Sequence, residues 1–299
     1  MDQKDKKIIV GIGEILWDLL PEGKQLGGAP ANFAYHAQAL GGSGFPISAV
    51  GDDDLGRELQ THLRRTGLDQ TYLVLDEEHP TGTVSVKLDD QGVPDFTIHE
   101  NVAWDFIPYT SEMKLLAPKV DAVCFGSLAQ RSVVSRNTIA AFLDAVPGNC
   151  IKIFDVNLRQ SFYSQSIIDG ALKRSNVVKL NEEELPIVAG MCHSTGTEIE
   201  MLTCLREQYQ LHFVVLTKGS KGSILLGPEG SSSIKAPAVT VADTVGAGDA
   251  FTAAVIMGLL QDLPMDIIQK NATMLAAYVC SQHGAIPKLS ETILKELML

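Results

Sequence analysis

Short apolar runs alternate along the chain with segments of helical periodicity, and this alternation predicts an α/β fold. Residues 30–40 are typical of a helix, because a proline opens the segment and apolar side chains recur at three-to-four spacing. Strands that alternate with helices form a mostly parallel sheet with helices on both faces. The runs expected to be its strands are 7–13, 45–50, 120–125, 151–155, 177–180 and 213–217.

Two stretches depart from this alternation. Residues 81–88 and 94–99 alternate polar and apolar positions around a turn at 89–92, which is typical of a β-hairpin, and residues 14–18 alternate in the same way. These strands form either an ordinary edge hairpin or a small β-sheet lid over the main sheet, with contributions from about 14–27 and 81–100. Further helices are expected at 55–66, 247–260, 265–281 and 290–298.

Size, charge and cysteines narrow the class of protein. The 299 residues, 45% of them hydrophobic, are enough for one large α/β domain spanning 1–299, alone or with a small appendage. The net charge of −12, from 24 basic and 36 acidic residues, argues against nucleic acid or an anionic membrane surface as the main partner. The five scattered cysteines have neither CxxC nor zinc-ligand spacing, which predicts reduced thiols in a cytoplasmic protein.

The strongest chemical signal lies near the C-terminal end, at 243–251. Gly246, Ala247 and Gly248 come just before Asp249, and an apolar helix follows. Small residues let the backbone approach a ligand, and a helix start presents free N–H groups and partial positive charge to an anion. Asp249 is either a cap stabilised by the helix dipole or a base held beside the anion. Such a site has the parts needed to activate a hydroxyl and hold a phosphoryl group.

Polar residues also follow the first predicted strand. Asp18 precedes a glycine pair at 27–28, and Asn32 falls in the first turn of the helix that this pair opens. Ligands of an open parallel sheet bind beyond the C-terminal ends of its strands. Asp18 and Asn32 can bracket several hydroxyl groups of a polyol, and the alternative is a tight glycine turn capped by Asn32.

Two later strands end in polar residues as well. Asn157 and Arg159 follow one of them, where an arginine clamps a phosphate or substrate oxygen, or forms an ordinary surface ion pair. Asn181 and Glu184 follow the next and lie on one face of a helix start. They can hold a hydrated Mg²⁺, although the helix dipole alone also favours acids at this place.

The strand at 213–217 leads into a glycine-containing turn. Thr217, Gly219 and Gly222 can cradle a nucleotide, although Lys-Gly turns are common between strands. The turn lacks the spacing of a Walker A loop, and the glycines at 246–248 lack the context of a dinucleotide-binding fingerprint. The turn alone therefore predicts a nucleotide site only weakly.

Five ordered motifs together resemble the ribokinase-like carbohydrate kinases of the PfkB family over nearly the whole chain. They are 27–32 (Gly-Gly-Ala-Pro-Ala-Asn), 155–159, 181–184, 217–222 and, most specific, 243–249. The form of the first motif is similar to that of bacterial fructokinases, as are Glu-Ile-Leu-Trp-Asp at 14–18 and Asn-Leu-Arg-Gln-Ser-Phe-Tyr at 157–163. Kinases of 2-keto-3-deoxygluconate share several of these features.

The resemblance implies a three-layer ribokinase-like fold and phosphoryl transfer from ATP to a primary sugar hydroxyl. In the family, the residue that matches Asp249 removes the proton from that hydroxyl. The backbone N–H groups that match Gly246, Ala247 and Gly248 form an anion hole for the transferred phosphoryl group. This agrees with the residues themselves, because phosphoryl transfer needs positioning and charge neutralisation more than covalent chemistry.

The same resemblance assigns binding roles to the other candidate residues. Those implied in sugar binding are Asp18, Gly28, Asn32, Asn157 and Arg159. Those implied in nucleotide binding are Asn181, Thr217, Lys218, Gly219, Ser220, Gly222 and Asn271.

Cofactors follow from the resemblance too. Glu184 matches a family glutamate that organises Mg²⁺ and phosphates largely through water, so ATP and Mg²⁺ are the implied cofactors. Family members often bind K⁺ near the segment that matches Asp243 and Val245, where Val245 offers only its backbone carbonyl. The predicted lid would exclude water from the phosphoryl group and pair two subunits into a homodimer.

D-Fructose, converted to fructose 6-phosphate, is the expected substrate. The alternatives are 2-keto-3-deoxygluconate or another sugar and, in a different class, a non-catalytic relative that binds sugar. Arg159 is one candidate cation for an anionic substrate and the lid offers few others, which favours a neutral sugar.

Overall fold

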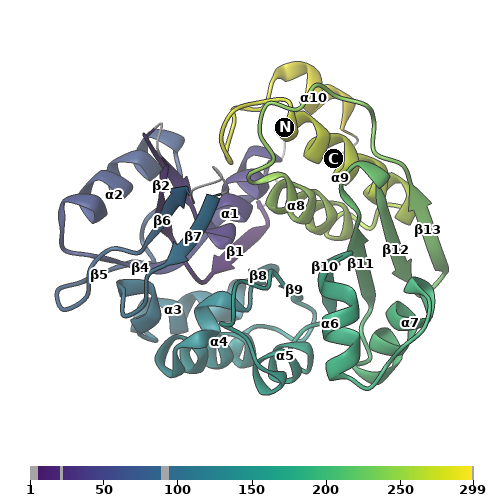
Figure 1. Ribbon diagram of the computed structural model, residues 1–299, viewed down its shortest axis with the longest axis horizontal. Coiled ribbons are helices and arrows are strands. Elements are labelled where there is room, and N and C mark those ends of the chain that lie inside the picture. The colour runs from purple at the N-terminus through teal and green to yellow at the C-terminus, as the bar shows by residue number, and fades with distance from the viewer. Residues whose placement is uncertain (1–5, 21–22, 89–93, 298–299) are drawn as a thin grey trace.

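The structure is a computed structural model that describes residues 6–20, 23–88 and 94–297. Within these residues the chain forms a nine-stranded sheet in the order β13-β12-β11-β10-β9-β8-β1-β4-β5 (Figure 1). The strands from β5 across to β11 run parallel, and β12 and β13 extend one edge antiparallel. The bounds are β1 Ile8–Ile12, β4 Ser43–Gly51, β5 Leu73–Asp76, β8 Ala122–Phe125, β9 Ile151–Asp155, β10 Val177–Asn181, β11 Phe213–Thr217, β12 Ser223–Gly227 and β13 Gly230–Ile234.

The central strands are the apolar runs that the sequence predicts. Strands β8 and β10 are buried almost throughout, as strands covered on both faces must be. The edge strands β5 and β13 lie outside the predicted runs. Strand β13 is a run of serines paired with the apolar β12, and β5 is only half-buried, so neither has the apolar pattern that marks a strand in the sequence.

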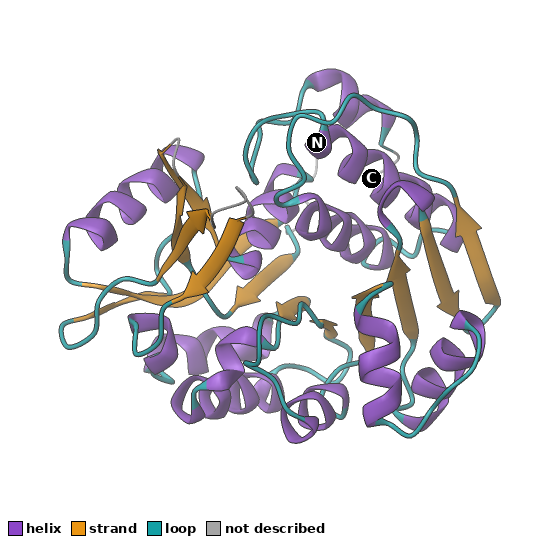
Figure 2. Ribbon diagram, in the orientation of Figure 1, coloured by secondary structure: helices purple, strands orange, loops and turns teal. Residues whose placement is uncertain are grey.

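Helices cover both faces of the large sheet, which confirms the predicted three-layer α/β fold (Figures 1 and 2). One apolar cluster joins the sheet to α1, α8 and α9, and the other joins it to α4, α5, α6 and α7. The helices are α1 Ala29–Ala39, α2 Asp54–Thr66, α3 Ser111–Leu116, α4 Val133–Ala145, α5 Gln165–Leu172, α6 Glu184–Met191, α7 Glu198–Gln208, α8 Ala247–Leu259, α9 Met265–Cys280 and α10 Glu291–Glu296. Short 3₁₀ helices lie at Ala103–Phe106, Ala117–Lys119, Leu128–Arg131 and Gly219–Lys221.

The described residues also form a separate four-stranded sheet in the order β3-β2-β6-β7. Its strands are β2 Leu16–Leu20, β3 Gly23–Gly27, β6 Thr83–Leu88 and β7 Pro94–Ile98. Neighbouring strands are antiparallel except β2 and β6, which run parallel. These strands lie in the two stretches predicted for a lid, but the first begins at Leu16, and Glu14 lies in the link from β1. The predicted turn at 89–92 lies outside the described residues.

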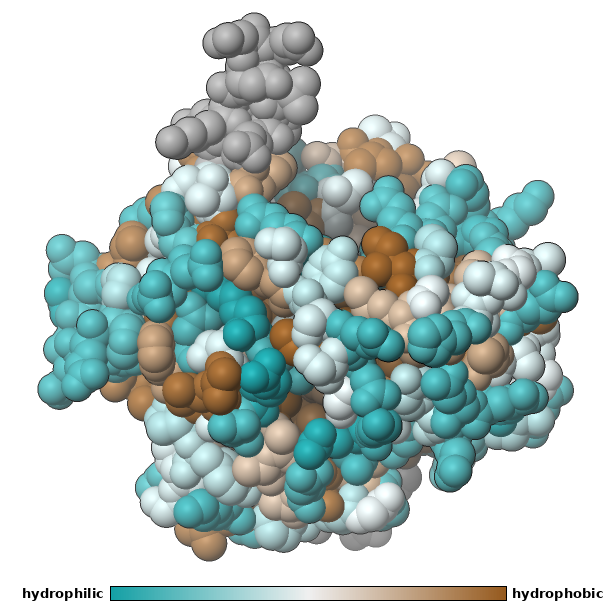
Figure 3. Space-filling view, turned by 60° about the horizontal axis from the view of Figure 1, so that its bottom comes forward, coloured by the Kyte–Doolittle hydropathy of each residue, from teal (hydrophilic) through white to brown (hydrophobic). Residues whose placement is uncertain are grey.

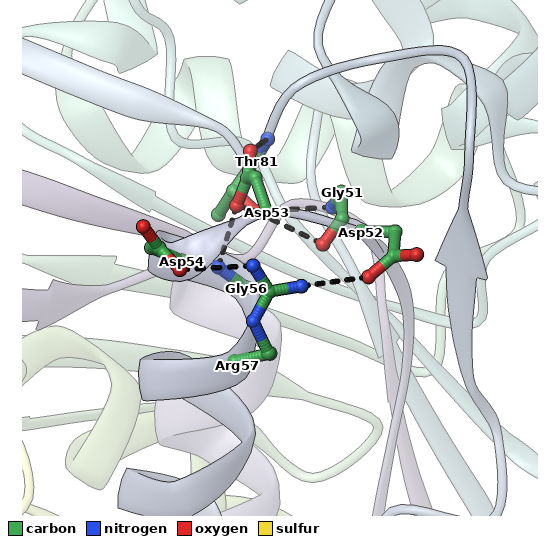
Figure 4. A network of polar contacts seen from close by, with 7 residues as sticks. All are labelled: Gly51, Asp52, Asp53, Asp54, Gly56, Arg57 and Thr81. Carbon is green, nitrogen blue, oxygen red and sulfur yellow. Dashed lines mark hydrogen bonds and ion pairs between the residues drawn. The ribbon is translucent and has the colours of Figure 1, made fainter.

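A polar network holds Thr81, two residues before the first residue of β6, beside the start of α2 (Figure 4). Asp53 caps α2 by accepting a backbone N–H in its first turn at 2.7 Å. The same carboxylate accepts the N–H of Thr81 at 2.8 Å and its hydroxyl at 2.7 Å. Arg57 pairs with Asp52 and Asp54 at 2.8 Å in solvent, where such pairs contribute little to stability. The bonds to Thr81 therefore attach the small sheet to the body of the protein.

The surface agrees with the acidic composition. The face shown in Figure 3 is mainly hydrophilic, with apolar residues in small separate groups. None of the helices in the described part of the chain has both the length and the apolar character needed to cross a membrane. All five cysteines are free thiols, and three of them are buried.

Candidate active site

The candidate residues meet where the order of the strands reverses. From β1 the chain passes to β4 and β5 on one side, and the later strands extend from β8 on the other side. Such a switch point opens a crevice at the C-terminal ends of the strands, where parallel sheets bind ligands. Helices α1 and α8 pack side by side there (Figure 1). Asn32 Nδ2 in the first turn of α1 donates to Asp249 Oδ2 in the first turn of α8 at 2.8 Å, although the two residues are 217 positions apart.

Helix α8 begins with backbone groups suited to an anion. Gly246 has a left-handed φ of 75°, and a Cβ there would lie 2.3 Å from the carbonyl oxygen of Ala285, so the position requires glycine. Among the described residues, the N–H groups of Gly248 and Asp249 have no hydrogen-bond partner. Free N–H groups at the positive end of a helix dipole attract a phosphate-like group.

Asp249 is half-buried, and its surroundings disfavour the charged carboxylate. Burial and the neighbouring Asp155 raise the pKa of Asp249 to about 6. The hydrogen bond from Asn32 and the positive charges of Lys179 and Arg159 oppose this rise. A carboxyl group with such a pKa is ionised at neutral pH and is a stronger base than an exposed aspartate, which suits a general base.

Asp18 lies on β2 close to Gly27 on β3. A Cβ at Gly27 would lie 2.5 Å from Asp18 Oδ2, so glycine leaves room for this carboxylate. Burial raises the pKa of Asp18 to about 6, and the positive charge of Arg159 opposes the rise. Asp18 therefore sits within electrostatic reach of Arg159, and the small sheet contributes a carboxyl group to the site.

Arg159 brings a positive charge near several carboxyl groups of the site. Its side chain is exposed and donates to the carbonyl of Leu158 at 3.0 Å, which leaves other N–H groups for a ligand. Its charge lowers the pKa of Asp18 and Asp249 against the effect of burial. Asn157, two residues earlier, has a left-handed φ of 45°, so the chain turns sharply at the end of β9.

Glu14 belongs to the site although the sequence-based prediction omits it. Its side chain is 3% exposed, and its Oε2 has no partner among the described residues. Burial raises the pKa of Glu14 to about 7; the positive charge of Arg159 opposes this rise, and the negative charge of Asp249 adds to it. Gly28 lets α1 start against this segment, because a Cβ there would lie 2.5 Å from the Glu14 carbonyl oxygen. The sequence signal for Glu14 is an acid directly after the first strand.

Asn32 has a second polar atom that remains available. Its Oδ1 is buried and has no partner within the described residues, while its Nδ2 is used by Asp249. Buried polar atoms normally have partners, so an unpartnered oxygen beside Asp249 indicates a place for a ligand donor. The free oxygens of Glu14 and Asn32 fit the hydroxyl groups of a polyol.

Lys179 is another residue of the site that the sequence-based prediction omits. Its Nζ lies 3.0 Å from both carboxylate oxygens of Asp155, at the end of the neighbouring strand β9. Thr252 Oγ1 lies 3.0 Å from Asp155 Oδ2 and 2.9 Å from the carbonyl oxygen of Gly248. The network thus joins β9 and β10 to the first turn of α8. The sequence signal for Lys179 is the presence of a lysine within an otherwise apolar, buried strand.

Asn181 and Glu184 form the start of α6. Asn181 Oδ1 accepts the N–H groups of Glu183 and Glu184 at 2.9 Å, so its side chain satisfies two backbone donors at the start of the helix. The Glu184 carboxylate accepts the N–H groups of Asn181 and Leu158, each at 2.9 Å. Each of its oxygens keeps a lone pair for water. A carboxylate held in this way fits a hydrated Mg²⁺ that is bound mainly by phosphates.

The turn after β11 lies beside this helix start. Lys221 Nζ pairs with Glu182 at 2.9 Å, and Thr217 Oγ1 lies 3.5 Å from the Leu180 carbonyl oxygen. Gly222 has a φ of 102°, and a Cβ there would clash with the backbone of β13. Gly219, Ser220 and Lys221 of this turn face solvent, while Lys218 pairs with Glu198 at 2.8 Å.

Two predicted residues lie at the margins of the site. Asn271 is completely buried in α9, so the structure does not bring it to the surface of the crevice. Asp243 joins two loops, because its carboxylate accepts the N–H of Val245 at 3.0 Å and that of Gly284 at 3.1 Å. Within the described residues, no group of three or more His, Cys, Asp or Glu side chains is arranged to hold a metal ion by itself.

A cavity of about 590 Å³ lies at the opposite edge of the sheet, beside the N-terminal ends of β9, β10 and β11. His212 and Asp262 are the titratable side chains in its lining. The carboxyl groups with raised pKa and the free N–H groups of α8 lie at the other edge, so the chemistry of the protein is concentrated there.

Known proteins resemble this chain in sequence and in structure. Residues 22–292 match the model of the pfkB family carbohydrate kinases. The chain is 32% identical over 296 residues to a fructokinase of Salmonella typhimurium, which covers 95% of this chain and 94% of that protein. A fructokinase of Vibrio cholerae O395, solved with fructose, ADP and calcium, has a TM-score of 0.79 and 28% identity over 98% and 99% of the two chains. A sugar kinase of Pyrococcus horikoshii has a TM-score of 0.81 and 29% identity over 94% of each chain.

These likenesses cover almost the whole chain and agree with the five motifs. The chain belongs to the PfkB family of carbohydrate kinases and has the ribokinase-like fold of that family. It is thus a sugar kinase by class, and the identity of its sugar is a separate question.

Proposed function

We propose that this kinase transfers the γ-phosphoryl group of ATP to the primary hydroxyl of a hexose, and that D-fructose, converted to fructose 6-phosphate, is its substrate. The observation that carries the proposal is the position of Asp249 in the first turn of α8, beside free N–H groups and the amide of Asn32. A base and an anion site within one helical turn are the parts that phosphoryl transfer to a hydroxyl requires.

In the proposed reaction, Asp249 accepts the proton of the sugar hydroxyl as its oxygen bonds to the γ-phosphorus of ATP. The bond from that phosphorus to the bridging oxygen breaks, and ADP leaves. The N–H groups of Gly246, Ala247 and Gly248 stabilise the charge on the transferred group. Asn32 holds Asp249 in place through the 2.8 Å hydrogen bond.

The other residues bind the reactants. Asp18, Gly28, Asn32, Asn157 and Arg159 hold the sugar, with Glu14 beside them. Asn181, Thr217, Lys218, Gly219, Ser220 and Gly222 line the nucleotide. Mg²⁺, when bound, would neutralise phosphate charge, and Glu184 would hold it through water. Asp243 and the Val245 carbonyl would hold K⁺.

The charge of the site supports a neutral sugar. The positive charge of Arg159 acts on three carboxyl groups, those of Glu14, Asp18 and Asp249. The carboxyl groups around this arginine are therefore more numerous than the positive charge that can balance them. A sugar acid would add a further negative charge to this group and needs a cation of its own. The relatives named fructokinase support D-fructose in particular.

A panel of sugars with ATP and Mg²⁺ tests the substrate. We expect kcat/KM for D-fructose to exceed that for 2-keto-3-deoxygluconate, D-glucose and D-ribose by about tenfold or more. A sugar that does not match the polar groups of the site leaves some of them without a partner, and this lowers its kcat/KM. Formation of ADP in a coupled assay measures the rates. A higher kcat/KM for the sugar acid would reject D-fructose. Absence of ADP formation with every sugar, together with sugar binding, would favour a non-catalytic relative.

The pH dependence tests the proposed base. Asp249 must be ionised to accept a proton, and burial with the neighbouring Asp155 raises its pKa to about 6. We therefore expect kcat/KM for the sugar to be constant above about pH 7 and to fall about tenfold per unit below about pH 6. An acid limb near pH 4, the ordinary range of an exposed aspartate, would contradict the role of this buried carboxyl group.

We also propose that two copies pair through the small sheet, which then acts as a lid over the sugar. The half-exposed Phe96 on β7 supports this, because it offers apolar area on that sheet. The free cysteines support a cytoplasmic location.

A further inference from the structure

Lys179 lies at the centre of a buried charged cluster to which the proposed reaction gives no role. Its Nζ contacts both oxygens of Asp155 at 3.0 Å, and its side chain is 11% exposed. Burial lowers the pKa of Lys179, but the charges of Asp155, Glu184 and Asp249 raise it above its usual value. The ammonium group is therefore charged, and three carboxyl groups from β9, α6 and α8 surround it.

The cluster is in direct contact with the first turn of α8. A Cβ built on Gly248 would lie 3.1 Å from Lys179 Nζ, so the ammonium group lies against this turn. One turn further along α8, Thr252 Oγ1 bridges Asp155 Oδ2 and the Gly248 carbonyl oxygen at 3.0 and 2.9 Å. Gly248 is thus held from one side by the charge pair and from the other by the hydroxyl, next to Asp249.

The charges around Asp249 show how the Lys179–Asp155 pair affects its ionisation. Asp155 and Glu14 are the carboxyl groups that act on Asp249, and Lys179 and Arg159 are the cations. Asp155 is the strongest of these neighbours and opposes ionisation of Asp249. Without Lys179, the buried Asp155 and the half-buried Asp249 would have to ionise near each other with less compensating positive charge, which is unfavourable.

We propose that Lys179 is a positioning residue of the kinase reaction: it neutralises Asp155 and holds it for Thr252, so that Asp249 can carry a negative charge at the start of α8. This inference rests on the proposed role of Asp249 as the base. It assigns Lys179 no contact with sugar or ATP, and its effect therefore lies in kcat and in the pH profile.

The first test is the variant Lys179→Met, which keeps the length of the side chain and removes its charge. We expect the acid limb of kcat/KM to move up by about one pH unit, because the attraction that favours ionised Asp249 is lost. Activity at pH 6 then falls about fivefold relative to the wild type, and most of it returns at pH 8.5. The KM for the sugar changes little. An acid limb at the wild-type position would overturn the proposal.

Two further variants keep the test decisive if Lys179→Met folds poorly. Asp155→Asn removes the opposing carboxylate and keeps an oxygen for Thr252, so we expect the acid limb to move to lower pH. Lys179→Met combined with Asp155→Asn leaves neither charge unpaired, and we expect its acid limb at or below that of the wild type. An acid limb of Asp155→Asn that stays at the wild-type position, or one of the double variant that lies above it, would show that the pair has only a structural role.

The control variant is Lys173→Met. Lys173 is an exposed lysine at the end of α5 that pairs with Asp169 of the same helix. We expect the pH profile of kcat/KM to stay unchanged in this variant. The variant Asp249→Asn separates this inference from the proposed function. Its kcat should be lowered by about a hundredfold or more at every pH, whereas Lys179→Met regains most of its activity at pH 8.5. If Asp249→Asn stays active, the role of the base fails; if only the acid limb of Lys179→Met fails to move, the inference about Lys179 fails alone.

Discussion

Replacing Asp249 with asparagine is expected to lower kcat by about a hundred- to ten-thousandfold, the range that positioned acid–base groups contribute. The amide keeps the size of the side chain and an oxygen for the hydrogen bond from Asn32, so the crevice keeps its shape. It cannot accept a proton from a sugar hydroxyl. The KM for the sugar should change far less than kcat, because the groups that bind the ground state remain. Steady-state measurement of ADP formation gives both constants.

Thermal unfolding of the same variant provides its control. The folded state raises the pKa of Asp249 to about 6, so at pH 7 the ionised carboxylate costs the folded state up to about 3 kcal/mol. That cost disappears as the pH falls below about 6, and an uncharged asparagine avoids it. The Tm of the variant at pH 7 should therefore equal or exceed that of the wild type. A variant that keeps the wild-type kcat would show that another group accepts the proton.

The second large effect is expected for Gly246→Ala, which should lower kcat by about a hundred- to thousandfold, as loss of an aligned backbone donor does. The new Cβ would lie 2.3 Å from the carbonyl oxygen of Ala285, at a φ of 75° that side chains rarely adopt. The first turn of α8 must then shift, and its free N–H groups lose their alignment. A loss of stability of about 1–3 kcal/mol should accompany the change.

Gly67→Ala is the matched control for this variant. Gly67 ends α2 with a φ of 80°, and the nearest heavy atom to a Cβ there would be 3.7 Å away. The substitution has the same backbone strain without the clash, far from the crevice, and should lower stability by about 1 kcal/mol with kcat unchanged. Equal kinetics of the two variants, measured beside their unfolding curves, would contradict the assignment of the anion site to the start of α8.

The sequence predicts those parts of the site whose chemistry lies in adjacent residues. The glycines before Asp249 and the glycine pair before Asn32 both mark helix starts, and the structure has helices beginning at both places. The bond between Asn32 and Asp249 spans 217 positions. It follows from α1 packing beside α8, which no local pattern contains, and only the five-motif resemblance connected the two segments.

The residues that the sequence-based prediction misses act singly within apolar segments. Lys179 interrupts a buried strand, Thr252 lies in a buried helix, and Glu14 lies in the apolar link that follows β1. Each gains its role from a partner on another element, such as Asp155 for Lys179. A polar residue in a segment that is otherwise completely buried is the signal that would have found them.

A crystal structure with D-fructose and a non-hydrolysable ATP analogue tests the central claim most directly. We predict that the oxygen of the C6 hydroxyl lies about 2.6–3.2 Å from a carboxylate oxygen of Asp249, with the terminal phosphate against the N–H groups at the start of α8. A complex in which that hydroxyl faces away from Asp249, or in which the phosphates bind at another edge of the sheet, would contradict the account.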